Sequence, residues 1–262
     1  SGGVDSSLAL LLLREQGYDP IAVHAHFCPP DQKAARVRDE LAAACRRLDV
    51  PYHVLDLSSA FQERIIEPFV RDYCSGLTPN PCALCNKRIK FDLLLRSAQD
   101  LGAQKLATGH YACLQPGLDK GLGLFRGLDR SKEQSYFLSL LSRKQLEQAC
   151  FPLGIWTKKE TVAALEKRAF QATAPSESQE ICFIPDNDYR GFVERQEVSL
   201  PGPGRILDSA GAVLGRHQGL HRYTIGQRKG LGIPYSEPLY VLHKDMHTNT
   251  LIVGTRDELQ SR

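Results

Sequence analysis

The sequence has 262 residues, of which 42% are hydrophobic and 24% charged, and this composition excludes a disordered or fibrous protein. The net charge is only +3, but residues 201–234 carry five basic residues and one acidic residue, so the positive charge is local. The longest apolar run, residues 8–13, is far shorter than the roughly 20 residues that span a bilayer. Because no basic segment followed by an apolar one marks a secretory signal, we expect a cytoplasmic protein without a membrane segment.

The first part of the chain alternates helical and extended patterns, which is typical of βαβ units in a doubly wound, mostly parallel α/β sheet. Helices are predicted at residues 6–16, 32–48, 58–73, 86–101, 142–149 and 157–168. Strands are predicted at residues 21–27, 52–57 and 105–108, and a glycine-rich hairpin at 117–127. We therefore expect a catalytic α/β domain over residues 1–185.

The pattern changes after residue 185. One helix is predicted at residues 189–195, and a basic segment rich in glycine and proline follows it. Strand-like patterns then appear at residues 239–242 and 250–253. We expect a small central domain over residues 186–234 and a separate β region over residues 235–262.

The chain opens with Ser-Gly-Gly-Val-Asp-Ser-Ser, which leads directly into an apolar helix. The backbone N–H groups and the helix dipole of such a turn converge on one anion site. Gly2 and Gly3 let a phosphate approach the backbone, the three serines offer hydroxyl groups, and Asp5 suits Mg²⁺ better than phosphate. The predicted polyphosphate contacts are Ser1, Gly2, Gly3, Val4, Asp5, Ser6 and Ser7.

This loop resembles the pyrophosphate loop (PP-loop) of ATP pyrophosphatases, which cleave ATP between the α and β phosphates. The Walker pattern G-x-x-x-x-G-K-[ST] is absent from the sequence, which argues against a P-loop enzyme that cleaves the γ phosphate. A Ser/Gly helix cap without a ligand is the alternative interpretation. Because the sequence starts inside the motif, the strand that should feed such a loop is missing from it; if the sequence were complete, the sheet would lack a central strand and ATP binding would be in question.

Cys82 and Cys85 form a C-x-x-C motif just before the helix expected at residue 86. The helix dipole and the nearby basic residues Lys87, Arg88 and Lys90 favour a thiolate, so a low cysteine pKa is predicted. Eight cysteines without an export signal serve metals or catalysis more often than structural disulfides.

Two simpler interpretations of this motif remain open. The spacing can be a coincidence, or the cysteines can form half of a zinc site. In the second case His217 and His221, which have helical spacing, would complete a metal-stabilised RNA-binding module that does not use ATP. The unpartnered cysteines Cys28, Cys45, Cys74, Cys113 and Cys150 are expected to be small buried hydrophobic residues, although Cys28 follows a strand expected beside the nucleotide and is also assigned to that site.

Residues 78–91 carry the C-x-x-C motif in a segment that resembles the signature of tRNA-specific 2-thiouridylases. Further segments similar to that family follow in the same order at residues 107–111, 132–138, 178–184 and 219–232. Together with the PP-loop these are six motifs, and the resemblance runs from residue 1 to about residue 254. By this resemblance the chain is a tRNA-modifying enzyme with a PP-loop domain, a central tRNA-binding domain and the truncated start of a C-terminal β-barrel.

The resemblance also assigns roles to individual residues. It makes Cys85 the catalytic cysteine, makes Cys182 the cysteine that carries a persulfide, and places Gly109 against ATP. The target base is expected to meet Asn80, Pro81 and Cys82. Other predicted tRNA contacts are His110, Lys132, Glu133, Gln134, Arg228 and Lys229, the last two within the basic segment.

This chain has Cys82 and Glu133 where many family members carry aspartate. The Glu133 exchange keeps the carboxylate, whereas a third thiol suggests a variant in which Cys82, Cys85 and Cys182 ligate a [4Fe–4S] cluster.

The implied reaction uses ATP and Mg²⁺ to adenylate the wobble uridine of an anticodon loop. Sulfur then arrives from a relay protein or a cysteine desulfurase through Cys182, and Cys182 and Cys85 finish as a disulfide. Another adenylating PP-loop enzyme that modifies tRNA, without a need for the two cysteines, is the alternative.

Overall fold

The computed structural model describes residues 2–28, 32–117, 121–170, 172–173, 181–184, 186–196 and 198–260. These residues form two compact units that are described separately. Unit 1 comprises residues 1–66 and 81–183, and unit 2 comprises residues 67–80 and 184–262. None of the described helices is long and apolar enough to cross a membrane.

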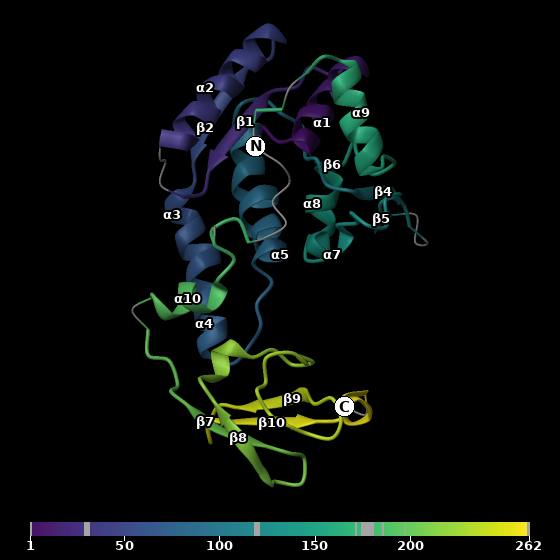
Figure 1. Ribbon diagram of the computed structural model, residues 1–262. Coiled ribbons are helices and arrows are strands. Elements are labelled where there is room, and N and C mark those ends of the chain that lie inside the picture. Colours follow the sequence, from purple (N-terminus) through teal and green to yellow (C-terminus); the bar gives the residue numbers. More distant parts are fainter. Residues whose placement is uncertain are drawn as a thin grey trace. The chain divides into compact units, whose positions relative to one another are not determined.

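Unit 1 contains two pairs of parallel strands. β1 (Ala22–His26) and β2 (Tyr52–Asp56) pair in register from Ala22 opposite Tyr52 to His26 opposite Asp56, and α2 (Gln32–Arg47) connects them (Figure 1). β3 (Leu106–Ala107) pairs with β6 (Ala149–Cys150). The α/β class is therefore confirmed, whereas a single doubly wound sheet is not confirmed, because the described parallel strands of this unit form two separate pairs.

The helix after the predicted phosphate loop, α1 (Val4–Glu15), starts two residues earlier than its pattern suggested. It packs against α9 (Lys158–Lys167). Leu8 and Leu12 of α1 are buried in a cluster with Tyr111, Leu153 and Leu165. This packing places the start of α1 beside the start of α9.

The cysteine motif lies in a continuous helical segment made of α5 (Pro81–Cys85), the π-helix η2 (Asn86–Leu94) and α6 (Leu95–Asp100). The helix was expected to begin at residue 86 but begins at Pro81, since the missing N–H of proline costs nothing in the first helical turn. η2 is kinked at Phe91, where φ is −91° and ψ is 17°.

The predicted hairpin is present but lies earlier in the chain. Its strands are β4 (Ala112–Pro116) and β5 (Leu122–Arg126). After it come α7 (Ser135–Leu138) and α8 (Arg143–Glu147). The second of these helices ends two residues before the predicted end, because β6 follows at once and pairs with β3. Buried residues of these elements form one core cluster with Phe91, Leu94 and Leu95.

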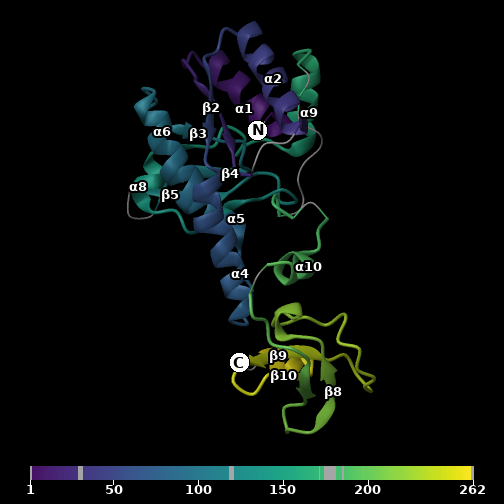
Figure 2. The same cartoon turned by 90° about the vertical axis from the view of Figure 1, so that its left-hand side faces the viewer.

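Unit 2 holds one four-stranded mixed sheet and several helices. The sheet order is β8 (Val213–His217), β7 (Gly204–Leu207), β10 (Thr250–Gly254) and β9 (Tyr240–Asp245), as Figure 2 shows in part. Strands from residues 186–234 and from residues 235–262 therefore share one sheet. The helical elements of unit 2 are α4 (Glu67–Cys74), α10 (Tyr189–Glu194), η3 (Leu220–Arg222) and α11 (Arg256–Gln260).

Unit 1 also contains α3 (Ser58–Phe61) and the π-helix η1 (Gln62–Ile66), which come before α4 in the chain. In unit 2, α4 contacts α10 through aromatic rings. Tyr73 stacks on Tyr189 with 5.0 Å between ring centroids, and Phe69 meets Phe192 edge to face at 6.1 Å. The helical segment that starts in one unit therefore supplies part of the core of the other.

Candidate active site

The predicted phosphate loop occupies the first turn of α1. Gly2 has a φ of +74°, and a Cβ atom at this position would lie 2.3 Å from Thr173 Oγ1, so the backbone here requires glycine. Gly3 caps the helix, and its carbonyl accepts hydrogen bonds from the Ser7 N–H and the Ser6 hydroxyl, each at 3.0 Å. Ser1 lies outside the described residues.

Asp5, the acidic residue of this loop, is already engaged by protein groups. Lys158 Nζ lies 2.6 Å from Asp5 Oδ1, and the Tyr111 hydroxyl donates to the same oxygen at 2.8 Å. The Tyr111 hydroxyl also lies 3.1 Å from Thr161 Oγ1 in α9. The loop carboxylate is therefore charge-balanced by a residue more than 150 positions away in the sequence.

Gly109 packs directly on the backbone of this loop. A Cβ atom on Gly109 would lie 2.7 Å from the carbonyl carbon and from the Cβ of Asp5. Contacts below 3.0 Å would push the loop away, so only glycine fits here. The predicted ATP contact at Gly109 thus falls on a residue that touches the phosphate loop.

The cysteines of the predicted sulfur chemistry all belong to unit 1. Cys85 is 8% exposed, whereas Cys82 and Cys182 are exposed residues. Surrounding protein atoms, followed by the neighbouring Cys85 and Cys82 thiols, raise the pKa of Cys182 to about 12. Cys28, also exposed, adds a smaller effect of the same sign. The fold therefore brings Cys85 and Cys182 within electrostatic range despite their distance in the sequence.

The low thiol pKa predicted at the C-x-x-C motif is wrong. Because the helix begins at Pro81, Cys85 lies inside a continuous helical segment, away from the helix N-terminus. Burial raises the pKa of Cys85, and the opposing effect of Lys90 is weaker. Cys82 is exposed as a residue, but surrounding protein atoms reduce the hydration of its thiol and likewise raise its pKa. In this structure all three are free thiols.

The other cysteines follow the sequence expectation unevenly. Cys45 is buried, as expected of a small hydrophobic residue. Cys74, Cys113 and Cys150 are partly exposed, and Cys28 is exposed, so burial was the wrong prediction for Cys28.

The geometry does not support either metal interpretation. Within the part of the chain that the structure describes, no three or more His, Cys, Asp or Glu side chains are arranged to hold a metal ion. The His217 ring accepts from the Gly219 N–H and donates to the Asn249 carbonyl, each at 3.1 Å. His221 Nε2 lies 2.8 Å from Glu194 Oε1. Both imidazoles of the predicted zinc module therefore have other partners within unit 2.

Two of the side chains predicted to contact tRNA near residue 133 accept hydrogen bonds from backbone N–H groups. Gln134 Oε1 accepts from the Tyr111 N–H at 3.1 Å, and the Gln134 N–H donates to the Tyr111 carbonyl at 3.0 Å. Glu133 Oε1 accepts from the Ser135 N–H at 2.6 Å and so satisfies a backbone donor at the start of α7. Lys132 is partly exposed in the same loop.

His110 and Asn80 are partly exposed, whereas Pro81, directly before the cysteine motif, is buried. His110 Nδ1 lies 2.7 Å from the Thr108 hydroxyl, and its ring meets Phe151 at 5.9 Å. Burial holds the pKa of His110 well below its usual value, so the ring is neutral at physiological pH.

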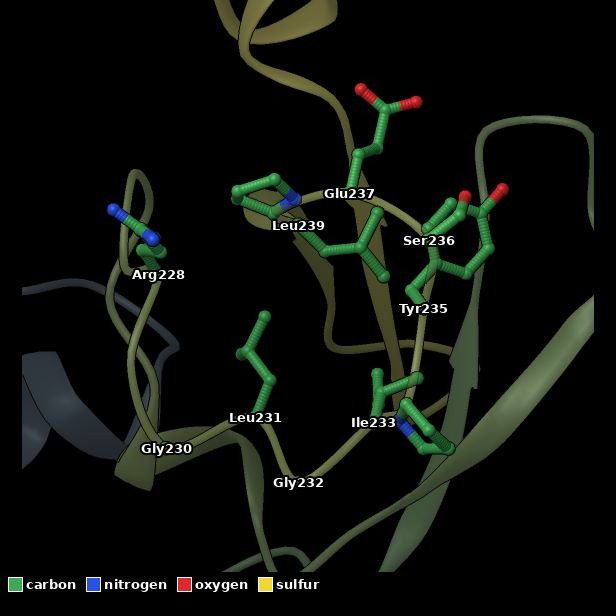
Figure 3. A pocket seen from close by; sticks show the side chains of 11 residues that line it. Arg228, Gly230, Leu231, Gly232, Ile233, Tyr235, Ser236, Glu237 and Leu239 are labelled. Carbon is green, nitrogen blue, oxygen red and sulfur yellow. The ribbon is translucent and has the colours of Figure 1, made fainter.

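Arg228 and Lys229 lie in an exposed loop of unit 2. Gln227 braces this loop, since it accepts from the Thr224 N–H at 3.0 Å and donates to the Lys229 carbonyl at 2.9 Å. The loop borders an open pocket of about 620 Å³. Arg228 and Tyr235 lie on opposite sides of this pocket in Figure 3.

Sequence reasoning missed three residues that organise the two units. Lys158 and Tyr111 hold Asp5 in unit 1, and the buried Lys244 donates to the Tyr223 carbonyl at 2.7 Å in unit 2. Burial lowers the pKa of Lys244 to about 8. The Thr157 to Glu160 capping box marked the start of a helix, but nothing in the sequence connected Lys158 with Asp5.

Comparisons with known proteins match the chain to two domain families and to several relatives. The family described as "tRNA methyl transferase HUP domain" matches residues 1–186, and "tRNA methyl transferase PRC-barrel domain" matches residues 191–255. Each of three relatives is named tRNA-specific 2-thiouridylase MnmA. The protein of Nitratidesulfovibrio vulgaris (strain Miyazaki F) is 52% identical, over 100% of this chain and 76% of its own length.

The two other relatives extend this likeness to further organisms. The Oleidesulfovibrio alaskensis protein is 50% identical over 100% of this chain and 75% of its own length. The Geobacter metallireducens protein is 42% identical over 99% of this chain and 74% of its own length. The chain belongs to the tRNA-specific 2-thiouridylase family.

Proposed function

We propose that this protein is an ATP-dependent tRNA sulfurtransferase that converts the wobble uridine of tRNA to 2-thiouridine. Its family membership supports the reaction, since the relatives carry that activity in their names. The structural observation that supports it best is the electrostatic proximity of Cys85 and Cys182 in the unit that also carries the phosphate loop. Sulfur transfer needs a thiol carrier and a second thiol to release the sulfur, and this arrangement supplies both.

The first step activates the uridine. The C2 oxygen attacks the α-phosphorus of ATP, the bond to the β-phosphate oxygen breaks, and pyrophosphate leaves. The loop at Gly2 and Gly3 would accept the phosphates through backbone N–H groups at the start of α1. Adenylation turns the uracil oxygen into part of a good leaving group, AMP.

The second step replaces oxygen by sulfur. Cys182 would carry a persulfide received from a relay protein or a cysteine desulfurase. The terminal sulfur attacks C2 and AMP departs with the oxygen. The Cys85 sulfur then attacks the Cys182 sulfur, so the old S–S bond breaks, a Cys85–Cys182 disulfide forms and the terminal sulfur remains on C2. A dithiol reductant restores both thiols.

The two inorganic groups fit the chain differently. Asp5 is an oxygen ligand of the type that Mg²⁺ prefers, so it would hold the ion that accompanies ATP and lowers the charge on the phosphates. For a [4Fe–4S] cluster on Cys82, Cys85 and Cys182 there is no structural support, since no three or more His, Cys, Asp or Glu side chains among the described residues are arranged to hold a metal ion. No step is assigned to a cluster.

The tRNA would be bound by residues of both units. We place the target base near Asn80, Pro81 and Cys82. Arg228 and Lys229 would meet the phosphate backbone, because they are exposed cations on a braced loop. Wobble uridine lies in a single-stranded loop, so it can turn out of its stack without breaking a base pair.

The proposal is tested with purified protein, tRNA, ATP and a sulfur-donating system. We expect Cys182→Ser to abolish 2-thiouridine, measured by mass spectrometry of tRNA nucleosides, while tRNA-dependent pyrophosphate release persists. Cys74→Ser, which removes a partly exposed thiol from unit 2, serves as the control and should keep thiolation. Normal thiolation by Cys182→Ser would refute the sulfur role.

The main competing function is adenylation of tRNA for a modification without sulfur. That reaction needs neither thiol, so Cys85→Ser and Cys182→Ser would both keep full product formation. The thiol cluster also favours sulfur transfer over the methyl transfer in the description of the matched domains.

A further inference from the structure

Lys158 has a backbone that is fixed from several sides. Thr157 caps α9, and its hydroxyl and N–H are paired with Glu160 in a capping box. The Lys158 N–H donates to Asp129 Oδ2 at 2.9 Å. The start of α9 is thus bound to the loop that contains Asp129, and the base of the Lys158 side chain has a defined position.

The ammonium group of Lys158 lies at the phosphate loop. Its Nζ is 2.6 Å from Asp5 Oδ1, and the side chain is only 20% exposed. It also lies 6.0 Å from the centroid of the Tyr111 ring. An ammonium group has three donor protons, and Asp5 is its only acidic partner among the described residues. Donor capacity therefore remains beside the loop that is expected to bind phosphates.

Asp5 has other interactions besides this cation that favour its negative charge. It lies in the first turn of the 12-residue helix α1, where the helix dipole already favours negative charge. It also accepts a hydrogen bond from Tyr111. An arriving polyphosphate, in contrast, would be repelled by Asp5 unless a nearby cation balanced it. The ion pair makes the loop neutral before an anion binds.

We propose that Lys158 is a phosphate-binding residue of the ATP site, which balances Asp5 in the free protein and donates to the β or γ phosphate of bound ATP. A lysine suits this task because its charge is compact and its stem is flexible. The inference rests on the ATP use in the proposed function, and it extends the site from the loop to the first turn of α9.

A pair of variants separates phosphate binding from simple charge balance. The affinity for ATP is measured calorimetrically in EDTA without tRNA, for Asp5→Asn and for Asp5→Asn/Lys158→Met. With Asp5 neutral, Lys158 has nothing left to balance, so its removal affects ATP only through direct contact. We expect Asp5→Asn/Lys158→Met to bind ATP about tenfold more weakly than Asp5→Asn does. This is the loss expected when one charge-assisted hydrogen bond to a phosphate is removed.

Three controls keep the result interpretable. Lys159→Met in the Asp5→Asn background removes the same charge from the exposed neighbour and should leave the affinity within about twofold. Adenosine binding should not change in any of these variants, because adenosine has no phosphate. Thermal unfolding midpoints of Asp5→Asn/Lys158→Met and of Asp5→Asn/Lys159→Met should match that of Asp5→Asn within a few degrees.

Three outcomes would overturn the proposal in different ways. Equal ATP affinity of Asp5→Asn and the double variant would show that Lys158 only balances Asp5, and the proposed thiolation would be unaffected. Failure of the unaltered chain to bind ATP, even with Mg²⁺, would remove the nucleotide site itself and Lys158's role with it. An equal loss of adenosine affinity would show a structural effect of the substitution.

Discussion

Cys182 combines exposure to reagents with an unfavourable environment for the thiolate. Surrounding protein atoms and the neighbouring thiols of Cys85 and Cys82 disfavour the Cys182 thiolate, and the opposing effect of Lys90 does not compensate. The resting enzyme therefore carries Cys182 as a thiol at neutral pH. The proposed sulfur transfer would therefore require the reactivity of Cys182 to increase when the sulfur donor or tRNA binds.

This environment predicts a specific pH dependence of alkylation. Because the pKa of Cys182 is raised to about 12, the thiolate fraction should rise about tenfold per pH unit through the alkaline range. The rate of carbamidomethylation by iodoacetamide, followed by mass spectrometry of the Cys182 peptide, should still be rising at pH 10. Glutathione under the same conditions should level off near its ordinary pKa of about 8.5. A plateau for Cys182 below pH 9 would contradict the structure.

The sequence predicted the residues of the phosphate loop but not the residues that contact its carboxylate, Asp5. The Ser-Gly-Gly pattern predicted the loop, and the positive φ of Gly2 and the close packing of Gly109 agree with the need for glycine there. Tyr111 and Lys158 could not be predicted as partners of Asp5, because their roles depend on the packing of α1 against α9.

Among the secondary-structure elements, the helical segment that carries the cysteines receives two side-chain hydrogen bonds from another helix. η2 is a π-helix, and such segments leave backbone carbonyls without their usual partners. Gln145 of α8 donates through Nε2 to the Lys87 carbonyl at 2.8 Å and to the Phe91 carbonyl at 2.9 Å. Gln145 therefore supplies a donor to two carbonyls of the irregular segment after Cys85.

Replacing that side chain should loosen the cysteine helix. We expect Gln145→Ala to lower the free energy of unfolding by about 1–3 kcal/mol, because two carbonyls lose their donor. Urea denaturation measures the change. Gln148→Ala, at the end of the same helix, is the matched control and should change the free energy of unfolding by less than about 0.5 kcal/mol. Equal effects of the two substitutions would mean that the hydrogen bonds of Gln145 are not specific.

The elements that the sequence predicted well are those with strong local signals. The helices at α1, α2 and α9 and the strands β1 and β2 differ from their predicted bounds by at most two residues. The cysteine helix begins at Pro81 rather than at the predicted residue 86, because a proline in the first helical turn costs no hydrogen bond. β6 was missed because two residues make a strand only through pairing with β3.

For the whole molecule, the sequence predicted the nucleotide loop and the cysteines of the sulfur transfer. It did not predict how the segments of the chain are divided between the two units. The motif order predicted a nucleotide loop and two remote cysteines, and family membership agrees with that order. Residues 67–80 belong to unit 2 although both flanking segments belong to unit 1. No linear pattern marks such an exchange, since it follows from contacts such as Tyr73 with Tyr189.

The proposed mechanism requires that Cys85 attacks Cys182 in the step that leaves the transferred sulfur on the uridine. The most direct measurement is non-reducing peptide mapping after a single turnover with persulfide-loaded protein, ATP and tRNA in the absence of reductant. The account predicts a Cys85–Cys182 disulfide in a one-to-one ratio with the 2-thiouridine formed. Product formed while both thiols stay free, or a disulfide that joins other cysteines, would contradict it.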